Sequence, residues 1–354
     1  MRKFFARLTE VRRWVGPAGL IAAAVFVGGR VLMEPLRRVP HFDSGGMEAY
    51  DAVEVFSLKK RPEPFKIAVL GSSITVWAII ESQLATDLGL EAGAVRRLAT
   101  PGGSNFDMWN MVRYNSHRFE DVELMVVEVN PFILQSGLDD DPRIRFTISQ
   151  HATLGERLLI HGGDERRMQV AEWVLPLQSV RRNLRSAFLN VADPPPGWKY
   201  FPDIADRTEP SRSWDPRSPR APEVKKPDET AHRLFGSWEA SKLQENSLRE
   251  LCAWCHARGI TLVLQQLPLH PAVARVVTEK KRFAAGLRKY QEFVEEMDLR
   301  PALFLRELDA AAVGIPLEGM RDTTHYNRVG AEIYTRHLAQ EIRPLLDAAP
   351  SAGN

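Results

Sequence analysis

Cysteine is scarce in this sequence, and charge of neither sign is in excess. The 354 residues include two cysteines, so no disulfide framework holds the fold together. Lysine and arginine number 47 against 45 aspartates and glutamates, a net charge of +2, and no basic stripe stands out beyond the N-terminus. Nucleic acid is therefore not an expected partner. The acidic triplet at 139–141 has no ligand loop around it, so no metal site is expected.

The N-terminus differs in composition from the rest of the chain. Residues 1–13 carry five basic side chains and one acidic one, and residues 14–33 follow with a single charge, Arg30. A run of about 20 apolar residues is long enough to cross a bilayer, and a basic flank stays on the cytoplasmic side. Because no convincing cleavage site follows, we expect an uncleaved signal anchor rather than a cleaved signal peptide. A buried or interfacial helix is the alternative.

After a linker over 34–64, short apolar runs alternate with helical periodicity. The runs predict buried strands at 66–70, 94–100, 122–129, 260–268 and 301–305. Strands that alternate with helices indicate right-handed crossovers and a parallel sheet, so residues 65–348 predict a three-layer α/β/α sandwich with a mainly parallel sheet. Single helices are expected over 73–89 and 272–297. The proline-rich segment at about 192–229 predicts an insertion rather than a core element.

Polar loops follow three of the predicted strands, where ligands lie in doubly wound sheets. Ser72 and Ser73 begin a helix, whose unpaired N–H groups suit an alkoxide or an oxyanion. Gly102, in "TPGGS", lets a backbone N–H approach a substrate closely. Asn130, in "VEVNPF", offers a side-chain amide. Each feature alone also fits a helix cap or a turn.

A fourth polar segment, "DTTHYN", precedes the last predicted helix. Asp322 lies three residues before His325, so its carboxylate can hold the imidazole by Nδ1–H. Nε2 is then left to accept the proton of a serine. A capping aspartate beside a surface histidine is the simpler alternative.

In this order, the segments resemble the SGNH, or GDSL-like, esterase and acyltransferase superfamily. Its Gly-Asp-Ser block is similar to 71–73, its second block supplies a glycine at Gly102, and its third supplies an asparagine at Asn130. Its Asp-x-x-His block is matched by Asp322 and His325. The fold implied is the flavodoxin-like SGNH fold over about 65–345.

The resemblance implies a role for each matched residue. Ser73 is the expected nucleophile, His325 the base and Asp322 the residue that orients it, while Gly102 and Asn130 bind the oxyanion. Two departures from the family blocks stand out: a serine replaces the aspartate before the nucleophile, and the third block, usually Gly-x-Asn-Asp, reads "EVNP". A serine before the nucleophile resembles the membrane-anchored, envelope-modifying branch.

The expected function is that of a membrane-anchored, extracytoplasmic serine esterase or O-acyltransferase, without metal or cofactor. Its partners would be an acylated envelope or secreted glycan or lipid, the membrane through the N-terminal helix, and an acyl-transfer membrane protein. The departures also leave open a non-catalytic glycan-binding or scaffold relative. The retained Ser73, Asp322 and His325 favour the enzyme.

The segment "CAWCH", residues 252–256, matches the attachment motif of a c-type haem. It lies within a predicted helix that leads directly into a strand, with Leu248, Leu251 and Cys255 on one apolar face. We therefore expect two thiols in the core rather than covalent haem.

Overall fold

The computed structural model describes residues 61–140, 151–174 and 226–348, together with isolated positions before residue 61 and residues 147–148. Within these residues, no helix is both long enough and apolar enough to cross a membrane. The anchor predicted at 14–33 and most of the insertion predicted at 192–229 lie outside the described residues.

The structure is built on a five-stranded parallel sheet, as the sequence predicted. Its strands are β3 (Ile67–Gly71), β4 (Val95–Ala99), β5 (Leu124–Glu128), β6 (Thr261–Gln265) and β7 (Leu303–Leu305). Their order is β4-β3-β5-β6-β7, and each neighbouring pair is parallel. This is a doubly wound order whose switch point lies between β3 and β5, where a crevice at the carboxyl ends of the strands can take a ligand.

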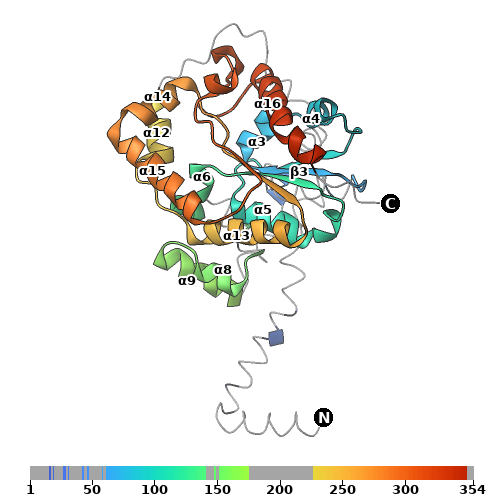
Figure 1. Ribbon diagram of the computed structural model, residues 1–354. Coiled ribbons are helices and arrows are strands. Elements are labelled where there is room, and N and C mark those ends of the chain that lie inside the picture. The colour runs from blue at the N-terminus through green and yellow to red at the C-terminus, as the bar shows by residue number, and fades with distance from the viewer. Residues whose placement is uncertain are drawn as a thin grey trace.

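Both faces of the sheet are covered by helices (Figure 1), consistent with a three-layer sandwich. In β3, Ile67 and Val69 belong to the hydrophobic core on one face, while Ala68 and Leu70 belong to the core on the other. Alternation follows from the two-residue period of a strand, and burial of both faces explains the continuous apolar runs. The first face is covered by α3 (Ser73–Ala78), α4 (Glu81–Leu88) and α16 (Arg328–Asp347), and the second by α5 (Asn105–Tyr114) and α13 (Lys242–Ala257).

Three further helices contact one another beside the sheet: α12 (Pro227–Phe235), α14 (Pro271–Glu279) and α15 (Lys281–Glu296). The remaining elements of the described residues are β1 (Phe42–Asp43), β2 (Gly46–Met47), η2 (Ser116–Arg118), α6 (Pro131–Leu134), η3 (Ser136–Asp140), α8 (Leu154–Leu158), α9 (Gly163–Val174), η5 (Ala310–Val313) and η6 (Leu317–Gly319). Strands β1 and β2 pair with each other in antiparallel register.

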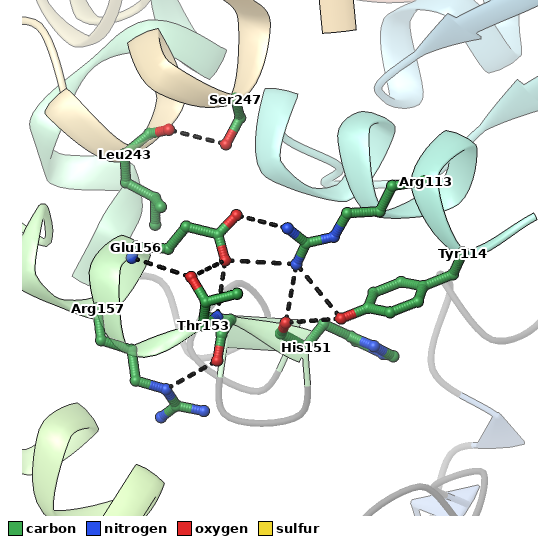
Figure 2. Close-up of polar contacts among 9 residues, drawn as sticks. Arg113, Tyr114, His151, Thr153, Glu156, Arg157, Leu243 and Ser247 are labelled. Carbon is green, nitrogen blue, oxygen red and sulfur yellow. Dashed lines mark hydrogen bonds and ion pairs between the residues drawn. The ribbon is translucent and has the colours of Figure 1, made fainter. Parts of the chain in front are cut away.

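Helix α8 is attached to α5 by a polar cluster (Figure 2). The Glu156 carboxylate accepts hydrogen bonds from the Arg113 guanidinium at 2.6 Å, and from the backbone N–H and hydroxyl of Thr153 at 2.7 and 2.9 Å. Tyr114 of α5 donates its hydroxyl to the carbonyl oxygen of His151 at 3.0 Å. In Figure 1, helices α8 and α9 lie below α13, on the side away from the sheet.

The single helix predicted over 73–89 is wrong, because the chain breaks into α3 and α4. Ile79 has an extended backbone, and the Arg97 guanidinium donates to the carbonyl oxygens of Val76 and Ile79 at 2.7 and 2.5 Å. The Thr335 hydroxyl accepts the N–H of Ile80 at 3.1 Å. These two side chains satisfy the polar groups that a continuous helix would have paired internally.

Two other predicted boundaries also differ. The helix predicted over 272–297 divides at Lys280, whose extended backbone redirects the chain so that α14 and α15 both pack against α12. Lys280 is also ion-paired with Asp228 of α12. The last residues of the predicted insertion instead begin α12, where Pro227 takes a first-turn position that suits proline.

Replacement of Arg97 tests this account of the break between α3 and α4. Arg97→Met leaves the carbonyl oxygens of Val76 and Ile79 buried without donors, so we expect the free energy of unfolding to fall by about 3 kcal/mol. Lys66→Met is the control, because Lys66 forms an exposed pair with Glu123 that contributes about 1 kcal/mol or less. Urea denaturation measures both, and equal losses would contradict the account.

Candidate active site

The two adjacent serines after β3 have different roles in the structure. Ser72 is the N-cap of α3, and its Oγ accepts the N–H of Ile74 at 3.2 Å. Ser73 is the first residue of the helix, and its Oγ lies 3.0 Å from Nε2 of His325, 252 residues away in the chain. The distance is within hydrogen-bond reach, so Ser73 rather than Ser72 is the serine that lies beside the histidine.

Asp322 completes the arrangement from the same loop as the histidine. Nδ1 of His325 lies 2.8 and 3.0 Å from the two carboxylate oxygens of Asp322. One of these oxygens also accepts the backbone N–H groups of Thr324 and His325, both at 2.9 Å. The carboxylate therefore fixes both the loop and the ring, and it leaves Nε2 directed at Ser73.

The ionisation of Asp322 suits this role. Burial acts to raise its pKa, but the hydrogen bond and charge of His325, with the N–H groups of Thr324 and His325, outweigh burial and hold the pKa well below its usual range. Asp322 therefore stays negative at neutral pH. A fixed negative charge beside Nδ1 suits an arrangement in which Nε2 can accept a proton.

The loop that carries Asp322 and His325 is held by elements that the sequence did not connect with it. The backbone N–H of His270, after β6, donates to the carbonyl oxygen of Thr323 at 3.1 Å. The hydroxyl of Thr230, in α12, lies 3.1 Å from that of Thr323. Neither contact has a local sequence signal, because both join segments far apart in the chain.

Two backbone N–H groups in the turns after β3 and β4, those of Ser73 and Gly102, are candidate donors to an oxyanion. Gly103 donates its N–H to the carbonyl oxygen of Thr100 at 2.7 Å and closes a turn, and Gly102 has the left-handed φ of 72° that favours glycine. Among the described residues, the N–H groups of Gly102 and Ser73 have no hydrogen-bond partner. Of the two neighbouring glycines, Gly102 is therefore the one with a free donor.

Asn130 is placed at the end of β5, with its side chain already engaged. Its Oδ1 accepts the N–H groups of Phe132 and Ile133 at 2.9 and 3.0 Å and caps α6. This orientation directs Nδ2 to the Glu128 carboxylate, with which it forms a short hydrogen bond. An oxyanion contact from the second N–H of Asn130 stays a prediction.

Glu128 is a residue of this region that the sequence did not single out. It ends the apolar strand β5, is 0% exposed, and accepts hydrogen bonds from the N–H and Oγ of Ser72 at 2.7 and 2.8 Å. The hydroxyl of Thr75 donates to the same carboxylate at 2.6 Å. The available signal was an acidic residue at the end of a buried strand, since such a charge needs partners.

Comparison with known proteins adds no identification. No family model matches the chain, and no curated protein matches it. The resemblance to the SGNH superfamily remains a prediction that rests on the sequence blocks.

The two cysteines of the haem-like motif lie on the buried face of α13, within the hydrophobic core. Burial raises the pKa of Cys255 to about 12, and burial, with the neighbouring Cys255, raises that of Cys252 further. His256, the last residue of the motif, has its Nε2 3.1 Å from the carbonyl oxygen of Arg300. Thioether bonds to a haem would require both thiols to leave the core.

The burial of Cys252 and Cys255 predicts their reactivity. In the folded protein both thiols should react slowly with Ellman's reagent, because they are inaccessible and protonated. Unfolding in urea should make both react at once, which provides the internal control. The purified protein should show no Soret band, and a covalent haem absorbance would contradict the placement of these residues.

Proposed function

We propose that this protein is an SGNH-type serine esterase or O-acyltransferase. The observation that carries the proposal is the hydrogen-bonded series Asp322–His325–Ser73, with distances of 2.8 and 3.0 Å. Its place at the carboxyl ends of β3 and β5, at the switch point of a doubly wound sheet, supports the SGNH fold.

The mechanism is acyl transfer in two steps. Oγ of Ser73 attacks an ester carbonyl while Nε2 of His325 takes its proton, and Asp322 stabilises the imidazolium. The N–H groups of Ser73 and Gly102, with the second N–H of Asn130, bind the oxyanion. His325 returns the proton to the leaving alcohol, which leaves an acyl-serine. Water or a sugar hydroxyl then attacks the acyl-serine and gives its proton to His325, which passes a proton to Oγ of Ser73 as the acyl group leaves.

We extend the proposal to location and substrate from the N-terminal sequence. A basic segment at 1–13 before an apolar run at 14–33 supports a membrane anchor with the α/β domain on the extracytoplasmic side. Acyl esters of an envelope or secreted glycan or lipid are the substrates that such a domain would meet, together with an acyl-transfer membrane protein as donor. Access of water to the acyl-serine decides between hydrolysis and transfer.

Covalent labelling with a fluorophosphonate tests the proposal. The full chain should be labelled, and Ser73→Ala should abolish labelling because it removes the hydroxyl that lies 3.0 Å from Nε2 of His325. Ser72→Ala, the adjacent control, keeps the nucleophile and should remain labelled at a reduced rate. A folded wild-type protein that is not labelled would instead favour the non-catalytic glycan-binding or scaffold relative.

Loss of the Asp322 charge should slow turnover of a model ester such as p-nitrophenyl acetate. Asp322→Asn keeps the shape of the side chain. It no longer stabilises the imidazolium, nor does it hold the neutral ring in the tautomer with a proton on Nδ1, so kcat should fall on the order of 10⁴-fold. Asp309→Asn is the matched control: Asp309 caps η5 through the N–H of Ala311 and does not contact the triad, so its kcat should stay within about twofold. An Asp322→Asn enzyme with wild-type kcat would rule out this role for the carboxylate.

A further inference from the structure

The Glu128 carboxylate lies beneath the turn that carries Ser73. It is 0% exposed, and no lysine, arginine or histidine of the described chain forms an ion pair with it. Its four hydrogen-bond donors are the N–H and Oγ of Ser72, the hydroxyl of Thr75 and the amide of Asn130. A buried carboxylate without a cationic partner depends on such hydrogen-bond donors. Loss of any one of them should therefore lower the stability of the fold.

The direction of these hydrogen bonds is fixed by their surroundings. The N–H of Ser72 is always a donor, and Asn130 cannot turn its amide round because its Oδ1 already accepts two N–H groups of α6. Oγ of Ser72 accepts the N–H of Ile74, which leaves its own hydrogen for Glu128. The side chain at position 128 must therefore accept on both oxygens, as a carboxylate does and an amide does not.

The preceding strand leaves room for this contact. A Cβ atom on Gly71 would lie 2.6 Å from Oε2 of Glu128 and would overlap the side chain of Thr75. No side chain larger than hydrogen fits there while Glu128 accepts from Ser72 and Thr75. The glycine before the two serines is thus required by the side chain of Thr75 and by the Glu128 carboxylate that Thr75 contacts.

We propose that Glu128 is a positioning residue that holds the Ser72–Ser73 turn and the amide of Asn130 in a fixed relation for acyl transfer. This role rests on the proposed function, since it concerns the same site. Glu128 bonds the residue before the nucleophile rather than Ser73 itself, so it acts through Ser72. Glu128 also accepts one N–H of the Asn130 amide, and this hydrogen bond fixes the direction in which the second N–H of that amide points.

The test is Glu128→Gln in the full chain. Glutamine keeps the size of the side chain but places an NH₂ group against the donors of Ser72 or Asn130. Two donors cannot bond each other, so the Ser72–Ser73 turn should shift. The rate of fluorophosphonate labelling and kcat for p-nitrophenyl acetate should both fall by about 100-fold, because a small misplacement of a reacting group has effects of this size. KM should stay within about twofold, since Glu128 does not contact the substrate.

Glu156→Gln is the matched control (Figure 2). Glu156 is also buried and also accepts from a backbone N–H and a threonine hydroxyl, both of Thr153, but it lies in α8, outside the active site. This variant should lower stability in urea while its labelling rate stays within about twofold of wild type. An equal fall in the labelling rate of Glu128→Gln and Glu156→Gln would point to a general loss of stability and would overturn the proposal.

A crystal structure of Glu128→Gln separates this proposal from the proposed function. If wild type is not labelled, the proposed function fails, yet the distance from Ser73 Oγ to His325 Nε2 still decides the positioning role. A distance unchanged from 3.0 Å, or wild-type labelling of a folded variant, overturns it. If Glu128→Gln does not fold, Thr75→Val removes a single donor and should slow labelling by about tenfold; no change in Thr75→Val would equally overturn the role.

Discussion

The parallel register of β3 and β5 is the constraint on which the proposed active site depends. Leu70 pairs with Val127, so the residues that follow, Gly71 and Glu128, end their strands side by side. The Ser72–Ser73 turn follows β3 at this level, and the Asn130 segment follows β5. Because the Glu128 carboxylate bonds both segments, the hydrogen-bond ladder of the sheet continues into the site as side-chain contacts.

The second half of the site comes from the far end of the chain. His325 reaches Ser73 because α16 packs on α3 and α4, on the same face of the sheet. The loop before α16 is fixed on both sides: the Tyr326 hydroxyl donates to the carbonyl oxygen of Pro268 at 2.8 Å, and the N–H of His270 donates to Thr323. The distance between His325 and Ser73 is thus set by core packing rather than by the loop alone.

Local patterns predicted the parts of the structure that local physics decides. Strands buried on both faces give continuous apolar runs, and a three-residue spacing from Asp322 to His325 is enough for a carboxylate to reach Nδ1. The break at Ile79 was not predictable in this way, because the side chains that cause it, Arg97 and Thr335, come from other elements. The partners of the Glu128 carboxylate are hidden for the same reason, since they lie more than 50 positions away in the chain or follow a turn.

The break after α3 has a mechanical consequence. Six residues at about 1.5 Å each make a helix roughly 9 Å long, with Ser73 at one end and the Arg97 guanidinium holding the carbonyl groups of the other. In a continuous helix, Ser73 and α4 would share one axis. The extended Ile79 ends that axis, so α4 is coupled to α3 through lateral contacts, with Arg97 bonded to Glu81 and α16 packed on both helices.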